Sequence, residues 1–169
     1  SSPITPGAYT VTVAGTDTAG NTATKTATFR KDTINVNGID PTTVSTSTTT
    51  LNVETSGAVG GADISVTSHL ENPSGNVSNP TGANVPGAFV EINASADLRN
   101  SLKWIYIEVK YNTAELPPDT DYSSLKLYVF DPAEGIWKAV EDIYDEVAKE
   151  WKRTGVDTTR QVIFGWVNH

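Results

Sequence analysis

The chain has 169 residues, of which 37% are hydrophobic, and its 20 acidic and 12 basic residues give a formal net charge of −8. This length can hold one full domain and part of another, and the negative charge argues against binding to nucleic acid or to an anionic membrane surface. The sequence has no cysteine, which excludes disulfides and thiolate metal sites. No apolar run approaches the roughly 20 residues that span a bilayer, so we expect no membrane insertion. Methionine is also absent, from which we expect a processed protein or a fragment of a longer one.

The first fifty residues begin with a predicted β-hairpin and continue into a polar junction. Residues 7–15 and 22–29 alternate apolar and polar side chains, and turn signals separate the two runs. Residues 31–33 are predicted to end the hairpin, and Asn-Gly and Asp-Pro turn signals follow. All but one of residues 42–50 are serine or threonine. Such a run is typical of a simple linker or a solvated edge strand, and an O-glycosylated linker is the alternative.

Strand patterns dominate the rest of the chain. The predicted strands are residues 50–54, 63–70, 89–94, 102–111, 125–130, 136–140 and 161–167. Residues 71–87, rich in proline and glycine, predict a long loop. Ile105, Ile107 and Val109 share one face of their strand and are expected to enter the core. Trp104 lies on the opposite face and is the tryptophan that we most expect to be exposed.

One segment changes period. Within residues 140–153, Ile143, Val147 and Trp151 recur at every fourth position, with acidic residues near the start and basic residues at the end. This spacing and charge order suit an amphipathic helix and its macrodipole. We therefore predict one short helix over residues 140–153, with Gly155 as its stop signal.

The sequence offers little catalytic material. His69 stands in a predicted strand and His169 is the last residue, and no nucleophile elbow accompanies them. Several carboxylates are of the type that serves glycoside hydrolysis, but nothing in their spacing singles out a pair. These carboxylates are Glu108, Glu115, Asp119, Asp121 and Glu134. We predict that the chain is not an enzyme and has no catalytic residues.

Calcium is the one cofactor that the sequence leaves open. Asp17 with Asn21, and Asp119 with Asp121, form small clusters of oxygen ligands in predicted loops. Neither cluster matches an EF-hand loop, and such residues more often cap their own turns.

Contacts with glycans are suggested in two ways. Asn76 and Asn93 each begin an Asn-x-Ser triplet, the pattern of N-glycosylation. Exposed aromatic side chains can stack on sugars, although they are more often anchors of a core or an interface. The four tryptophans, all after residue 100, are Trp104, Trp137, Trp151 and Trp166.

Two resemblances to known families extend these observations. The motif Pro-Gly-Ala-Tyr-Thr-Val-Thr-Val, continued by Gly-Thr-Asp and Ala-Gly-Asn, makes residues 7–32 similar to the last two strands of bacterial and archaeal immunoglobulin-like repeats. Residues 50–169 resemble the PGF-pre-PGF type domain of archaeal surface and secreted proteins. The segments that carry this second resemblance are residues 91–94, 104–111, 123–128, 135–137, 155–158 and 166–169. This second resemblance implies a cell-surface location. The helix predicted over residues 140–153 would be an insertion relative to the family, and the family provides no catalytic residue to assign to this chain.

The fold class that we predict is all-β. It is an antiparallel β-sandwich with an N-terminal immunoglobulin-like hairpin and one short helix near residues 140–153. The expected division is a hairpin over residues 1–32, a Ser/Thr-rich junction over 33–49 and a β-sandwich surface-protein module over 50–169.

The predicted function is that of a structural or adhesive module of an archaeal extracellular protein, in a surface layer, a filament or a stalk. A carbohydrate-binding module and an accessory domain of a secreted protease or glycosidase are the alternatives. The expected partners are proteins, including self-association through the N-terminal hairpin, and glycans. A two-stranded ribbon is marginal by itself, so the hairpin has three options: docking within the chain, pairing with another chain, or fraying.

Overall fold

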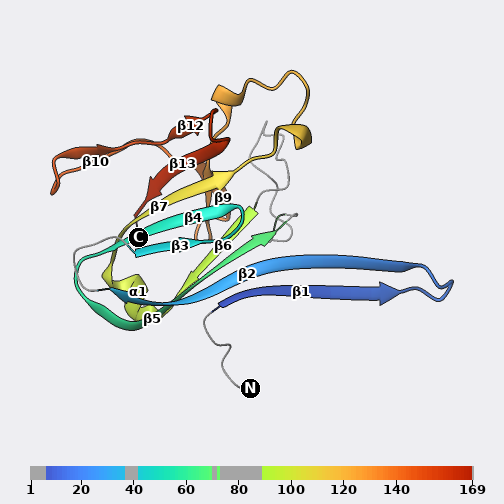
Figure 1. Cartoon of the computed structure of the whole chain (residues 1–169). Helices are drawn as coiled ribbons and strands as arrows, with labels where there is room; N and C mark the ends of the chain where they lie inside the picture. Colours follow the sequence, from blue (N-terminus) through green and yellow to red (C-terminus); the bar gives the residue numbers. More distant parts are fainter. Residues whose placement is uncertain (1–6, 37–41, 70–71, 73–88, 169) are drawn as a thin grey trace.

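The structure is built almost wholly from strands. A computed structural model describes residues 7–36, 42–69, 72 and 89–168 (Figure 1). The strands are β1 (Gly7–Thr16), β2 (Thr22–Val36), β3 (Thr42–Ser45), β4 (Thr49–Thr55), β5 (Val59–His69), β6 (Phe89–Ala94), β7 (Leu102–Lys110), β8 (Tyr128–Asp131), β9 (Ile136–Ala139), β10 (Ile143–Asp145), β11 (Glu150–Lys152), β12 (Gly155–Asp157) and β13 (Val162–Val167). The helices of the described residues are α1 (Ala96–Ser101) and two 3-10 turns, η1 (Thr113–Glu115) and η2 (Tyr122–Ser124).

Two antiparallel sheets form the body of the molecule. One has the strand order β1-β2-β5-β6, and the other has the order β12-β13-β7-β4-β3. β2 pairs with β1 over its first part and with β5 from Thr28 to Val36, so it runs past the end predicted at residues 31–33. The end of this hairpin, residues 11–16 of β1 and 22–27 of β2, projects from the sheet as a two-stranded arm (Figure 1).

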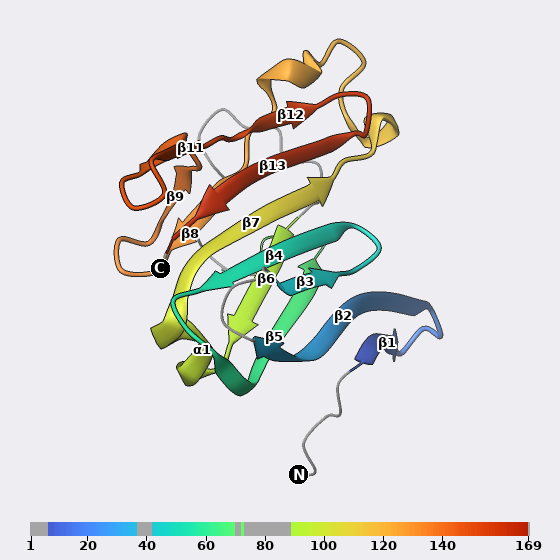
Figure 2. The ribbon, with the colours of Figure 1, turned by 60° about the vertical axis from the view of Figure 1, so that its left-hand side comes forward.

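The sheets face each other across one hydrophobic core. β4 buries alternate residues, and Leu51 and Val53 on its inner face are 0% exposed. Ile64 of β5 meets them from the other sheet, and Leu98 of α1 joins the same cluster. Full burial of such side chains stabilises a fold by about 1.5–3 kcal/mol each. The period-two pattern of the strands therefore specifies which faces meet (Figure 2).

β7 confirms the core face predicted for it. Ile105, Ile107 and Val109 are all buried and belong to the core cluster. β4 and β13 flank β7 on either side, so this strand is central in its sheet. The predicted antiparallel β-sandwich is likewise confirmed, as is the predicted pairing of the strands now labelled β8 and β9.

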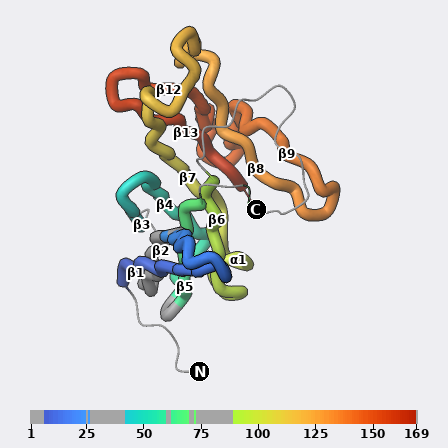
Figure 3. Tube along the Cα trace, turned by 90° about the vertical axis from the view of Figure 1, so that its right-hand side faces the viewer, coloured from blue at the N-terminus to red at the C-terminus, as the bar shows by residue number. Residues whose placement is uncertain are grey.

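The β8–β9 hairpin extends the core past β6. The Trp137 ring lies 5.9 Å from the Phe89 ring of β6, measured between centroids. Just after β9, the Val140 side chain approaches Gly165 of β13 so closely that an added Cβ would lie 2.9 Å from it. The hairpin therefore covers the inner face of β13, beside which it lies in Figure 3.

The helix predicted over residues 140–153 is wrong, because this segment forms the β10–β11 hairpin. The carboxylate of Asp145 accepts hydrogen bonds from the backbone N–H groups of Val147 and Ala148, which closes a turn instead of a helix. Lys149 then takes a φ of 56°, which is incompatible with a right-handed helix. Val147 is 84% exposed at the tip of the hairpin, so its spacing of four residues from Trp151 does not indicate a shared buried helix face. The short helix of the fold is instead α1.

Some predictions fall at the margin of the described residues. Except for Asn72, the loop predicted over residues 71–87 lies outside them, and so does Asn76. The Ser/Thr-rich run at residues 42–50 contains β3, an edge strand that turns through Thr46 into β4. Among the described helices, none has the length and apolarity needed to cross a membrane.

Candidate functional site

The edge of β1 is the first candidate binding surface. β1 lies at the end of its sheet, and its ten residues carry no charged side chain. Val11 is 47% exposed and Val13 is 65% exposed, and they pair with residues 27 and 25 of β2, outside the stretch of β2 that pairs with β5. The free side of β1 faces away from the other described strands in Figures 1 and 2.

The tip of this arm contains the first predicted calcium cluster, and the structure gives it another role. The carboxylate of Asp17 accepts hydrogen bonds from the backbone N–H groups of Ala19 and Asn21, both at 2.9 Å. It also accepts one from the side-chain amide of Asn21 at 2.8 Å. The hydrogen bonds from Asn21 are the main reason why the pKa of Asp17 is lowered. Asp17 therefore holds the turn between β1 and β2.

The second calcium cluster is also used for local capping. The Asp121 carboxylate accepts hydrogen bonds from the hydroxyl and the backbone N–H of Ser123, which start η2, and these bonds lower the pKa of Asp121. Asp119 is exposed in the preceding turn. Within the described part of the chain, no group of three or more His, Asp or Glu residues is placed to hold a metal ion.

A second surface is the outer face of the five-stranded sheet, which is rich in aromatic rings. Tyr106 of β7 lies 5.0 Å from Trp166 and 6.1 Å from Phe164, both of β13. Beside them, Arg160 donates two hydrogen bonds to Glu108 at 2.8 and 2.7 Å, and these lower the pKa of that carboxyl. Burial, together with the hydrogen bond from its hydroxyl to Glu108, raises the pKa of Tyr106 to about 12.

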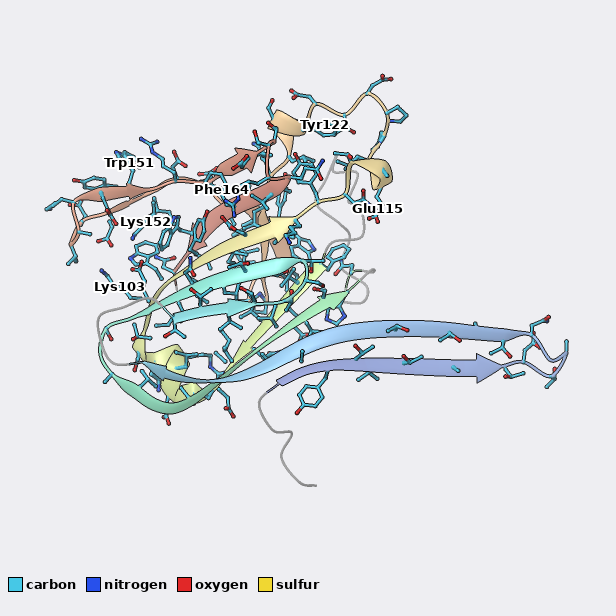
Figure 4. The ribbon with its side chains drawn as sticks, in the orientation of Figure 1. Lys103, Glu115, Tyr122, Trp151, Lys152 and Phe164 are labelled. Carbon is cyan, nitrogen blue, oxygen red and sulfur yellow. The ribbon has the colours of Figure 1, made fainter. Side chains whose placement is uncertain are left out.

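The β10–β11 hairpin covers one end of this aromatic face. Lys152, only 5% exposed, points from the hairpin toward the sheet (Figure 4), and its Nζ lies 4.0 Å from the centre of the Trp166 ring. The same Nζ lies 3.6 Å from the Glu54 carboxylate and 2.8 Å from that of Glu150. Burial acts to lower the pKa of Lys152, but the hydrogen bond to Glu150 and the neighbouring negative charges raise it overall.

Trp104 lies beneath this hairpin, so the prediction that it would be the exposed tryptophan is wrong. It is 6% exposed, and its indole N–H donates to Asp145 at 2.9 Å. The backbone N–H of Ala148 is the largest cause of the lowered pKa of Asp145, about 2, and Trp104 and the Lys103 charge add to it. Asp145 thus joins the turn of the hairpin to the sheet below.

The outward face of the same hairpin carries an exposed aromatic pair. Trp151 is 53% exposed and Tyr144 is 38% exposed, and their rings meet edge to face at 5.4 Å. The guanidinium of Arg153 lies 4.9 Å from the Trp151 ring and is bound to Asp142 at 2.6 Å. Sequence reasoning missed this pair because it predicted a helix here. Asp145, four residues before Lys149, was a usable signal for a turn, since Asp side chains often accept hydrogen bonds from the backbone of a turn.

His69, most of the carboxylates weighed for hydrolysis and the glycosylation candidate Asn93 have local partners. His69 contacts Glu91 at 3.0 Å, and Asn93, exposed on β6, donates to the same Glu91 at 2.8 Å. Four of the five carboxylates considered for glycoside hydrolysis have separate partners: Glu108 binds Arg160, Glu115 accepts from Asn112, Asp121 accepts from Ser123, and Glu134 pairs with Lys138.

Comparison with known proteins adds no relative. No family model matches the chain, and neither the curated proteins nor the solved structures contain a match. The resemblances to immunoglobulin-like repeats and to the PGF-pre-PGF type domain stay predictions from sequence.

Proposed function

We propose that this chain is a structural or adhesive module of an archaeal extracellular protein, and that the edge of β1 is its attachment surface. The observation that carries the proposal is that, among the described residues, this edge is unprotected. Soluble proteins usually shield long edge strands with charges, proline, bulges or a covering segment. β1 has ten residues without charge or proline, and its pairing with β2 shows no bulge.

Other edges of the described sheets contrast with β1. β3 and β12 have four and three residues, and β6 carries Glu91 at its centre. A ten-residue edge offers main-chain N–H and C=O groups over about 33 Å, at roughly 3.3 Å per residue. Addition of a strand to such an edge is an established mode of protein recognition, in which backbone hydrogen bonds supply the affinity.

The proposal is tested by blocking the edge in the cells that make the protein. Val11→Lys places a charge on the exposed part of β1, and Val129→Lys is the matched control, because Val129 on β8 is 44% exposed against 47% for Val11. After fractionation, we expect the wild-type chain and the control in the envelope fraction and most of the Val11→Lys chain in the medium. Recovery of the wild-type chain from the cytoplasm, or equal retention of both variants, would contradict the proposal.

The exposed pair of Tyr144 and Trp151 favours glycan binding as a second candidate function. An exposed indole beside a guanidinium provides an apolar platform next to hydrogen-bond donors, a combination that suits a sugar ring. On a glycan array, the wild-type chain should bind at least one glycan, and Trp151→Ala should lose that signal. Val147→Ala, a change at the 84% exposed tip of the same hairpin, should keep it. An array without signal above background would remove this candidate.

A further inference from the structure

We infer that β1 pairs with β1 of a second copy of this chain, antiparallel, about a twofold axis through Val11. This inference rests on the proposed function of the β1 edge and names the partner of that edge. It would join the two four-stranded sheets edge to edge into one continuous sheet. The argument comes from the sequence of β1, its exposure and its place at the sheet edge.

The sequence of β1 is almost a palindrome. Residues 7–15 read Gly-Ala-Tyr-Thr-Val-Thr-Val-Ala-Gly, and reversal changes only the positions of tyrosine and one valine. In an antiparallel pair, opposite residues lie on the same face of the sheet. With Val11 opposite Val11 of the partner, the other opposite pairs are Thr10 with Thr12, Tyr9 with Val13, Ala8 with Ala14, and Gly7 with Gly15.

This register matches like with like on both faces. Tyr9, Val11 and Val13 occupy one face of the strand and would meet the same apolar set in the partner. Thr10 and Thr12 occupy the other face, where Thr12 already contacts Thr26 of β2 through their hydroxyls at 3.3 Å. Pairing of the two copies would continue this row of threonines across the interface, and Thr–Thr pairs and apolar β-branched pairs both stabilise sheets.

Neighbouring registers fit less well. A shift of one residue sets the apolar face against the other face, for example Val11 opposite Thr10 or Thr12, because the side-chain period is two. A shift of two residues keeps the apolar and threonine faces matched, but it places Gly7 opposite Val13 in one direction and Tyr9 opposite Gly15 in the other. In the register centred on Val11, by contrast, apolar residues pair with apolar residues, threonine with threonine and glycine with glycine.

Exposure and charge allow the approach. Val11 and Val13 are the exposed large apolar side chains of this strand, at 47% and 65%. The chain has a formal charge of −8, so two copies repel each other at long range, but β1 itself contributes no charge to the contact. A twofold contact uses the same edge in both copies and is closed, so the assembly stops at a dimer and does not continue into a fibre.

Cysteine cross-linking of the full-length chain tests the register. The chain has no cysteine, so Val11→Cys introduces the only thiol. Residues directly opposite each other have Cα atoms about 4.5–5.5 Å apart, which a disulfide can span. Under mild oxidation we expect Val11→Cys to form a covalent dimer at least tenfold faster than Val129→Cys, whose residue is equally exposed on β8.

Threonine variants distinguish this register from the shifted ones. Thr10→Cys alone should cross-link slowly, and a mixture of Thr10→Cys with Thr12→Cys should cross-link as fast as Val11→Cys. Sedimentation of the wild-type chain should give twice the 18.0 kDa mass of one chain, and Val11→Lys should give the single mass with an unchanged circular dichroism spectrum.

The outcomes separate this inference from the proposed function. A wild-type chain that is monomeric at about 100 μM, or cross-linking of Val11→Cys no faster than that of Val129→Cys, overturns the self-pairing. If such a monomer is still held in the envelope fraction through β1, a different protein is the partner and the proposed function survives. A dimer through β1 in a chain that stays in the cytoplasm would support the self-pairing and remove the proposed function.

Discussion

Replacing Lys152 with methionine should loosen the β10–β11 hairpin from the sheet beneath it. The Lys152 ammonium lies 4.0 Å from the centre of the Trp166 ring and 5.9 Å from that of Trp104. It also pairs with Glu54 at 3.6 Å. Methionine keeps the length and most of the volume of lysine, so the change removes the charge and leaves little cavity.

The magnitude follows from these contacts. A desolvated cation over an indole contributes about 1–2 kcal/mol, and Lys152 is only 5% exposed. Loss of the ion pair leaves the Glu54 carboxylate, 23% exposed, without its cation, while removal of a buried ammonium relieves a desolvation cost. Because these last two effects oppose each other, we expect a net loss of about 1–2 kcal/mol in the free energy of unfolding. For a chain of this size, that loss corresponds to a decrease in Tm of roughly 2–8 °C.

Urea unfolding followed by tryptophan fluorescence measures this loss, at one protein concentration because association also stabilises a folded chain. Lys149→Met is the control, since Lys149 is 69% exposed and pairs with Glu146 on the surface. Its effect should stay within about 0.5 kcal/mol. Equal effects of the two variants, or a loss below about 0.3 kcal/mol for Lys152→Met, would refute the reasoning that this cation holds the hairpin.

Other changes test the packing and the electrostatics of the fold. Gly165→Ala should lower the free energy of unfolding by about 1–3 kcal/mol, because the added Cβ would lie 2.9 Å from its nearest side-chain neighbours. Gly57→Ala is the control in the same urea titration and should change stability little, because a Cβ there meets nothing within 4 Å. Equal losses would contradict the packing of β13. Leu51→Ala should cost about 2–5 kcal/mol by calorimetry, since Leu51 is 0% exposed, and a loss below about 1 kcal/mol would contradict the packing of the sheets. The Asp145 carboxyl has a pKa of about 2 in the folded chain, mainly because of the Ala148 N–H, against 3.8 in the unfolded chain. The ionised carboxylate therefore stabilises the fold fully above about pH 4, and this stabilisation is lost as the pH falls toward 2. Asp145→Asn should flatten the pH dependence of Tm over that window, and an unchanged slope would refute the assignment.

The strands could be predicted from sequence wherever one face is buried and the other is not. β4 alternates buried and less buried residues, as β7 does from Ile105 to Val109, and period two is a local property that the fold preserves. The length of β2 could not be predicted in this way. Its residues after Thr33 look like a polar junction, but they pair with β5 through backbone hydrogen bonds that side-chain identity does not report.

The environment of the aromatic residues could not be predicted because it depends on distant segments. Trp104 is covered by Asp145, 41 residues later in the chain, and this contact requires the hairpin that the helical spacing concealed. A spacing of four residues is compatible with a helix but also with a tight hairpin, and the decisive feature was the turn. The Asp145 carboxylate and the positive φ of Lys149 both belong to that turn.

The two candidate surfaces are independent in space, and this has a consequence for adhesion. β1 belongs to the four-stranded sheet, whereas Tyr144 and Trp151 lie on a hairpin over the outer face of the five-stranded sheet. Pairing of two chains through β1 would therefore leave both aromatic pairs accessible. Two linked sites bind a surface that displays repeated ligands more tightly than one site, often by a factor of 10² or more, without any new contact. If the hairpin binds glycan weakly, a dimer through β1 would make that site sufficient for adhesion. Val11→Lys should then weaken retention on a glycan-coated surface much more than binding of the same glycan free in solution.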